Sequence, residues 1–310
     1  MKVLFMGTPD FAVGILSAIC EKSDHEVVAV VTQPDRPKGR SGVPVFSPVK
    51  QYAEDHGLMV IQPVKIKEAD EVSKLRGIEA DIYVVAAFGQ ILSKEILDIP
   101  KYGCINVHAS LLPKYRGAAP IQWAVADGLK TTGVTIQQMN EGVDTGDIIS
   151  SKEVAIDDDE TGGSLFDKLM NASAVLITDT LDMIEAGTAV HTPQDESEAT
   201  YAKMLKKEMG LIDFARPAVE IERLIRAFTP WPGGFTYLNG KMLKIKKCHA
   251  SDENTGECAK ITKVSKDTIT VACGKGSLVI TALQSEGKKE MSAHDFLLGN
   301  SLSVGTKLGM

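Results

Sequence analysis

The chain has 310 residues, of which 44% are hydrophobic and 24% charged, and its formal net charge is −7. This length suits two domains, and the composition is that of an ordinary globular protein. No apolar run reaches the ~18 residues of a membrane span, so no membrane partner is expected, and an acidic total by itself argues against nucleic acid.

The first part of the chain alternates short apolar runs with helical patterns. The runs are continuously apolar, as in strands buried on both faces of a parallel sheet, and lie at 2–7, 26–33, 58–63, 81–88 and 104–108. Helical patterns follow at 10–22, 49–57 and 69–77, and glycine closes the last two. This order predicts an α/β domain with a Rossmann-like, doubly wound, mostly parallel sheet, whose ligands gather at the carboxyl ends of its strands.

The remaining chain changes character after one long helical pattern. Two more strands are predicted at 133–139 and 147–156, followed by an amphipathic helix at 164–187. Residues 190–210 are polar and predict a linker. A short helix at 217–228 and several short strands then indicate a small β-barrel, OB-like, with a hairpin turn at Asn239-Gly240. We therefore expect domains at 1–189 and 211–310.

Cofactor signatures are missing from the expected places. The first turn, "GTPDFAVG", carries Pro9 where a dinucleotide-binding turn would have its second glycine, and no phosphate-binding loop is present. An NAD enzyme is therefore not expected. Five widely spaced cysteines without a C-x-x-C pair favour free thiols in a cytoplasmic protein over disulfides or zinc.

Asn106 and His108 end the fifth predicted strand, at the edge where ligands gather. Residues two apart in a strand share a face, so the amide and the imidazole should converge. Together they could stabilise an oxygen that gains negative charge during acyl transfer and could move a proton. The structural alternative is a core histidine that bonds to backbone.

A carboxylate is needed to orient that imidazole and to favour its charged form. The loop "NEGVDTGDII" offers Asp144 and Asp147. Two acids three apart could also begin a metal site, but no His or Cys completes one in this loop, so no metal is expected. A plain turn remains the structural alternative.

These motifs together resemble the formyltransferases that use 10-formyltetrahydrofolate. Asn106, His108, "SLLPKYRGAAP" (110–120) and "GVDTGDII" (142–149) match the family in order and spacing. The resemblance implies a catalytic set of Asn106, His108 and Asp144. It implies a folate site lined by Ser110, Leu111, Leu112 and Pro113. Formylfolate would be the co-substrate, and neither metal nor NAD would be needed.

A basic loop, residues 32–50, bears on which amine accepts the formyl group. It is long for a connection between strand and helix, and it carries Arg36, Lys38, Arg40 and Lys50. It resembles the loop that family members acting on methionyl-tRNA insert into the acceptor stem, with Arg40 at the key position. A solvated surface loop is the alternative that charge alone leaves open.

Acidic and basic residues are distributed unevenly along the chain. Residues 1–202 hold 17 Lys and Arg against 30 Asp and Glu, whereas residues 203–310 hold 17 against 11. Lys203, Lys206 and Lys207 are spaced to share a helical face in the linker, and Lys244 and Lys246 belong to a basic run of the barrel. We expect these five lysines to contact tRNA.

The resemblance, extended to the basic barrel, predicts formyl transfer to the α-amino group of initiator methionyl-tRNA by a monomer. Two alternatives stay open: a formyltransferase for a small amine, such as glycinamide ribonucleotide or an amino-sugar nucleotide, and a non-catalytic RNA-binding protein.

Overall fold

The computed structural model describes residues 1–37, 44–253 and 256–309. The chain divides into two compact units. The first comprises residues 1–120, 131–155 and 166–202, and the second comprises 121–130, 156–165 and 203–310.

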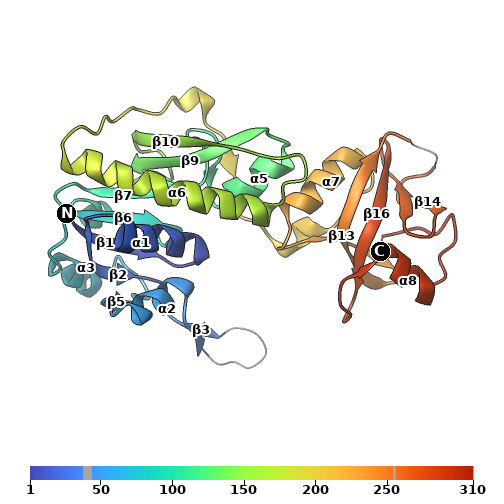
Figure 1. Ribbon diagram of the computed structural model, residues 1–310, viewed down its shortest axis with the longest axis horizontal. Helices are drawn as coiled ribbons and strands as arrows, with labels where there is room; N and C mark the ends of the chain where they lie inside the picture. Colours follow the sequence, from blue (N-terminus) through green and yellow to red (C-terminus); the bar gives the residue numbers. More distant parts are fainter. Residues whose placement is uncertain (38–43, 254–255, 310) are drawn as a thin grey trace. The chain divides into compact units, whose positions relative to one another are not determined.

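A seven-stranded sheet forms the centre of the first unit (Figure 1). Its strand order is β10-β9-β7-β6-β1-β2-β5. The strands are β1 (Lys2–Gly7), β2 (Glu26–Val31), β5 (Val60–Ile61), β6 (Ile82–Ala86), β7 (Cys104–His108), β9 (Thr131–Gln138) and β10 (Ile148–Ala155). The pairs from β5 to β7 are parallel, and β9 and β10 are antiparallel additions. The predicted mostly parallel sheet is confirmed.

Helices cover both faces of this sheet because its strands are apolar on both faces. On one face, alternate β1 residues such as Leu4 and Met6 join an apolar cluster with α3 (Ala69–Arg76) and α4 (Lys94–Leu97). On the other, α1 (Asp10–Lys22) and α6 (Gly162–Glu185) lie side by side, with Phe11 packed edge-on against Phe166 at 5.6 Å (Figure 1). The helix α2 (Pro48–Asp55) packs against α1.

The strand β7 reaches the carboxyl edge of the sheet between β6 and β9. Its antiparallel neighbour β9 places Gln137 opposite Asn106 and Thr135 opposite His108. The loop 139–147 then joins β9 to β10 and returns to the same edge. Three non-glycine residues around this edge have left-handed backbone conformations: Ala87 (φ 45°), Tyr115 (φ 59°) and Asp144 (φ 54°). Such conformations concentrate at functional sites.

The second unit contains an antiparallel sheet in the order β12-β13-β16-β15-β14, with β17 paired to β16. Its strands are β12 (Gly234–Leu238), β13 (Lys241–Ser251), β14 (Ile261–Val264), β15 (Ile269–Ala272), β16 (Ser277–Ser285) and β17 (Met291–Ser292). The final segment hydrogen-bonds both edge strands, since Ile261 N–H donates to Thr306 and Gly309 N–H to Tyr237. The helices α7 (Ala218–Ala227) and α8 (Ala293–Gly299) pack on its apolar core. The predicted C-terminal β domain is confirmed.

Residues 190–210 contain less helix than their lysine spacing predicts. They form two short 3-10 turns, Glu196–Glu198 and Lys207–Gly210, and the strand β11 (Tyr201–Ala202). The expected helical face of Lys203, Lys206 and Lys207 is therefore wrong. The physical reason is tertiary: β11 pairs with β8 (Arg116–Gly117) of the first unit, and this pairing holds the chain extended directly before Lys203.

Candidate active site

His108 is buried at the end of β7, with 6% of its surface exposed. Its Nε2 lies 2.9 Å from the carbonyl oxygen of Tyr115, to which an Nε2–H donates. Its Nδ1 lies 3.6 Å from Oδ1 of Asp144. A ring held between a carbonyl and a carboxylate has a fixed orientation, as a proton-transferring imidazole requires.

Asp144 is the point on which the neighbouring donors converge. Its Oδ2 accepts the N–H of Gly117 at 2.8 Å, and its Oδ1 accepts Nε2 of Gln137 at 3.0 Å. The amide nitrogen of Asn106 lies 3.4 Å from the same Oδ1, a long hydrogen bond. The sheet edge therefore brings Asn106, His108 and Asp144 together. Their catalytic role stays a prediction.

Asp144 and not Asp147 is the carboxylate that meets Asn106 and His108. The main chain of Asp147 is hydrogen-bonded to β9, because its carbonyl oxygen accepts the N–H of Gln138 at 2.8 Å. Among the residues that the structure describes, no group of three or more His, Cys, Asp or Glu side chains could hold a metal ion.

Gln137 is a site residue that the sequence reasoning missed. It is 2% exposed, and its Oε1 accepts the N–H of Gly146 while its Nε2 donates to Asp144. The available signal was the polar pair in "GVTIQQM", because a buried amide inside an apolar strand needs polar partners. Gln137 fixes both the carboxylate and the backbone of the loop that carries it.

Two glycines allow close backbone approaches around Asp144, Gly146 on the loop and Gly117 on β8. A Cβ at Gly146 would overlap the carbonyl oxygen of Gln138. Gly117 has φ +108°, and a Cβ there would lie 2.9 Å from the carbonyl oxygen of Ala202. Its N–H reaches Asp144 because the backbone adopts a conformation that favours glycine.

The predicted folate segment, Ser110 to Pro113, begins two residues after His108, the last residue of β7. Ser110 is 1% exposed, and its hydroxyl donates to the carbonyl of Lys114 at 2.6 Å. The Leu112 N–H donates to Oγ1 of Thr135 on β9. The hydroxyl of Ser110 thus shapes the turn, and Leu112 is buried, while Leu111 and Pro113 are partly exposed.

The predicted tRNA residues of the basic loop are partly described. Arg36 is exposed on the short strand β3 (Arg36–Pro37), which pairs with β4 (Pro44–Val45). Lys38 and Arg40 lie outside the described residues. Lys50, at the base of the loop, donates to Asp35 at 2.6 Å, and this bond together with one from Gln62 holds the pKa of Asp35 below its usual value.

The predicted lysines beyond residue 202 lie on the second unit. Lys203, Lys206 and Lys207 are exposed. Lys244 and Lys246 alternate with the buried Leu243 and Ile245 on β13, so that both face outward from the core. Lys246 lies 3.7 Å from Glu290, an ion pair that any phosphate would have to compete with.

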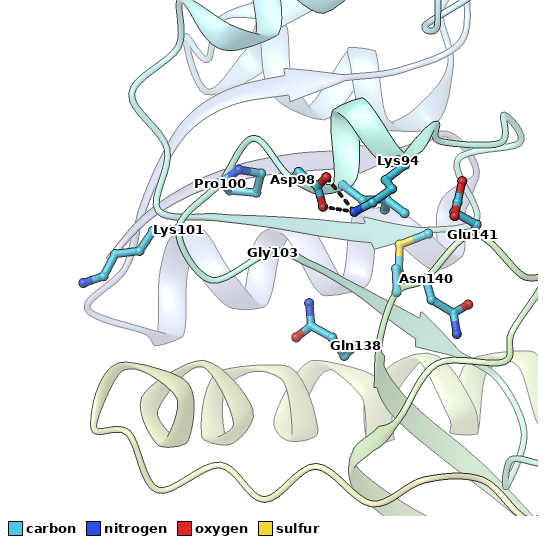
Figure 2. Close-up of a pocket in the computed structure, with 10 residues that line it drawn as sticks. Lys94, Asp98, Pro100, Lys101, Gly103, Gln138, Asn140 and Glu141 are labelled. Carbon is cyan, nitrogen blue, oxygen red and sulfur yellow. Dashed lines mark hydrogen bonds and ion pairs between the residues drawn. The ribbon is translucent and has the colours of Figure 1, made fainter.

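The first unit also contains a surface pocket of about 440 Å³ (Figure 2). Its lining includes Lys94 and Asp98, which are ion-paired, and Gly103 before β7. It also includes Gln138 at the end of β9 and Asn140 after that strand. None of Asn106, His108 and Asp144 lines it. The candidate active site is therefore defined by its converging side chains rather than by this pocket.

The sequence of this chain is similar to those of known proteins over its whole length. Residues 1–181 match the formyl transferase family, and residues 204–301 match the formyl transferase C-terminal domain. The chain is 54% identical to a methionyl-tRNA formyltransferase of Lachnospira eligens, covering 100% of both chains, and 55% identical to that of Agathobacter rectalis, covering 99% of both. Its fold is similar to an N-formyltransferase of Helicobacter canadensis solved with folinic acid and dTDP-3-aminofucose, with TM-score 0.67, 21% identity, and 92% and 99% of the two chains covered.

Proposed function

Because this chain belongs to the formyltransferase family over both of its domains, we infer that it is an enzyme that formylates methionyl-tRNA. The formyl donor of this family is a formylfolate, and we propose 10-formyltetrahydrofolate. The acceptor is the α-amino group of methionine on initiator tRNA, and its product starts translation.

The observation that carries the chemistry is the convergence of Asn106 and His108 on Asp144. In the proposed reaction the neutral amine attacks the formyl carbon, and the carbonyl oxygen becomes an oxyanion. The amide of Asn106 donates a hydrogen bond to this oxygen. The attacking nitrogen loses a proton, the folate nitrogen gains one, and the bond between that nitrogen and the formyl carbon breaks.

His108 and Asp144 supply the proton transfer in this proposal. The carboxylate faces Nδ1 of the imidazole. In this proposal the pair gives a proton to the departing folate nitrogen and takes up the proton that the attacking amine loses, so that the pair is unchanged after one turnover. Ser110 to Pro113 form the turn beside this pair, which supports their assignment to the folate site. Gln137 and Gly117 hold Asp144 in place from opposite carboxylate oxygens.

We assign the two substrates to different parts of the chain. The acidic residues 1–189 hold the catalytic set and would bind folate. The tRNA would contact Arg36, Lys38 and Arg40 of the basic loop, Lys203, Lys206 and Lys207 after the strand β11, and Lys244 and Lys246 of the C-terminal domain, residues 211–310. Exposed cations that neutralise phosphates supply most of the affinity for a nucleic acid backbone.

An acceptor comparison tests the function. The enzyme is incubated with formylfolate and one of three amines: methionyl-tRNA, glycinamide ribonucleotide or an amino-sugar nucleotide. We expect turnover with methionyl-tRNA only. Turnover with a small amine and indifference to tRNA would establish the alternative transferase, and tRNA binding without any turnover would establish a non-enzymatic protein.

The basic loop is tested separately by Arg40→Ala. This change should weaken binding of methionyl-tRNA and leave folate binding unchanged, because the loop is assigned to the acceptor stem alone. Equal loss of both affinities would overturn the assignment of the loop. The matched control is Arg76→Ala, since Arg76 is an exposed arginine of α3 that is paired with Glu95.

A further inference from the structure

Residues 192–202, which we call the strap, cross the edge of the candidate active site within the first unit. In Figure 1 the strap follows α6 and is drawn in gold. At its start, Thr192 exchanges two main-chain hydrogen bonds with Ile148, at 2.8 and 2.9 Å. At its end, β11 pairs with β8. Both ends are therefore fastened beside the loop that carries Asp144.

The side chain of Gln194 points from the strap into that loop. Its Nε2 donates to the carbonyl oxygens of Asp144, at 2.9 Å, and of Gly146, at 2.7 Å. Its Oε1 accepts from Nε and Nη2 of Arg116, at 3.1 and 2.8 Å. Every polar atom of this amide is engaged, and its donors act on the backbone of Asp144 itself.

Arg116 holds Gln194 in this orientation. Its side chain is 0% exposed, and its Nη1 and Nη2 form a two-pronged pair with the carboxylate of Glu196, at 2.9 and 2.7 Å. A buried guanidinium is stable only when its charge is matched and its N–H groups are satisfied. Strap residues 194 and 196 together meet this requirement, so Arg116 and the strap order each other.

The backbone of Asp144 needs such support. Its φ of 54° lies in the left-handed region, which a non-glycine residue keeps only where its surroundings fix it. Gly117 and Gln137 hold its carboxylate, and the amide of Gln194 holds its carbonyl oxygen. Gln194 also lies between the two family matches, which end at residue 181 and resume at residue 204.

We propose that Gln194 is a positioning residue for Asp144, and that Arg116 and Glu196 keep it in place. This inference rests on the proposed function, because it assigns Asp144 a part in the reaction. Gln194 then connects the backbone of Asp144 to the segment that joins the two domains.

The test measures kcat and KM for formylfolate and methionyl-tRNA in two variants. Gln194→Ala removes the amide. Gln194→Glu keeps the length and the contact to Arg116 but turns an acceptor toward two carbonyl oxygens. Both should lower kcat about tenfold or more and leave each KM within about twofold, as when a group that orients a functional side chain is lost. The matched control is Glu198→Ala, an exposed strap residue that pairs with Lys114 and should keep wild-type kcat.

A double-mutant cycle separates positioning from general stability. If Gln194 acts through Asp144, then adding Gln194→Ala to Asp144→Ala should lower kcat no further, within about twofold. An undiminished loss in the double variant, or single variants as active as Glu198→Ala, would overturn the proposal. If Gln194→Ala does not fold, as judged by thermal unfolding, Gln194→Glu decides. A wild-type enzyme without turnover would instead contradict the proposed function.

Discussion

The orientation of the Asn106 side chain is set by its position on the strand β7. Asn106 precedes His108 by two positions on β7, so strand alternation places both side chains on the face that contacts Asp144. In the proposed reaction its amide donates a hydrogen bond to the oxyanion. The amide is therefore expected to act in the transition state more than in substrate binding.

Replacing Asn106 should consequently lower kcat and spare substrate affinity. For Asn106→Ala we expect a loss of about 100-fold or more, the usual effect of removing one oxyanion donor. Asn106→Asp keeps the shape but removes the donor, so it should lose a similar factor. Steady-state kinetics with formylfolate and methionyl-tRNA measure both. A raised KM with normal kcat would show that Asn106 only binds substrate.

At the scale of elements, the hairpin between β12 and β13 rests on its two turn residues. Asn239 and Gly240 have φ of 52° and 74°, the left-handed pair that a two-residue turn requires. For Gly240→Ala we expect the free energy of unfolding to fall by about 1 kcal/mol, because a Cβ is disfavoured in this region. Urea unfolding measures the change.

Gly299→Ala provides a matched control for this prediction. Gly299 ends α8 without a left-handed backbone, and a Cβ there would meet nothing within 4 Å. Alanine favours helix, so this variant should be as stable as the wild type or slightly more stable. Equal destabilisation by both changes would contradict the turn assignment.

The contribution of the strap to stability should depend on pH through the carboxylate of Glu196. The hydrogen bonds from Arg116 hold the pKa of Glu196 below its ordinary value of 4.5. A carboxyl group with a lowered pKa stabilises the fold fully above its unfolded pKa, and this contribution is lost as the pH falls through the folded value. The stability difference between wild type and Glu196→Gln should therefore be constant above pH 4.5 and shrink below it.

Denaturant unfolding at several pH values from 7 to about 3 measures this difference. Glu198→Gln is the control, because Glu198 is exposed and its contact to Lys114 is a 3.7 Å surface pair. Such pairs contribute little, so this variant should match the wild type throughout. A difference between wild type and Glu196→Gln that persists unchanged at low pH would show that the carboxylate is not what holds Arg116.

For the whole molecule, the separation of charge predicts different salt dependences for the two substrates. Residues 203–310 carry an excess of lysine and arginine, and residues 1–202 an excess of acids. Binding of methionyl-tRNA should weaken about tenfold or more as salt rises from ~50 to ~200 mM, because neutralised phosphates release counterions. Folate binding should change far less. Equilibrium binding of each substrate checks this, and equal slopes would refute the assignment of the basic residues to tRNA.

The local pattern of apolar and turn residues in the sequence determined much of the secondary structure of this protein. The parallel strands, α1 and the Asn239-Gly240 turn were predictable because each depends on burial and on the conformational preferences of a few adjacent residues. The meeting of Asn106 and His108 was also predictable, since it needs only a strand and its alternation. The role proposed for Asp144 came from a family resemblance, and the structure places its carboxylate 3.6 Å from the imidazole.

Tertiary structure alone decided what surrounds that carboxylate. Gln137 was hidden in a strand pattern, and Gln194 lies 50 residues beyond Asp144 in a polar segment without periodicity. Arg116, in the segment 110–120, is fully buried, and its guanidinium is hydrogen-bonded to Gln194 and Glu196. No local rule reveals such contacts, because hydrogen bonds between distant segments form only when the fold brings their donors and acceptors together.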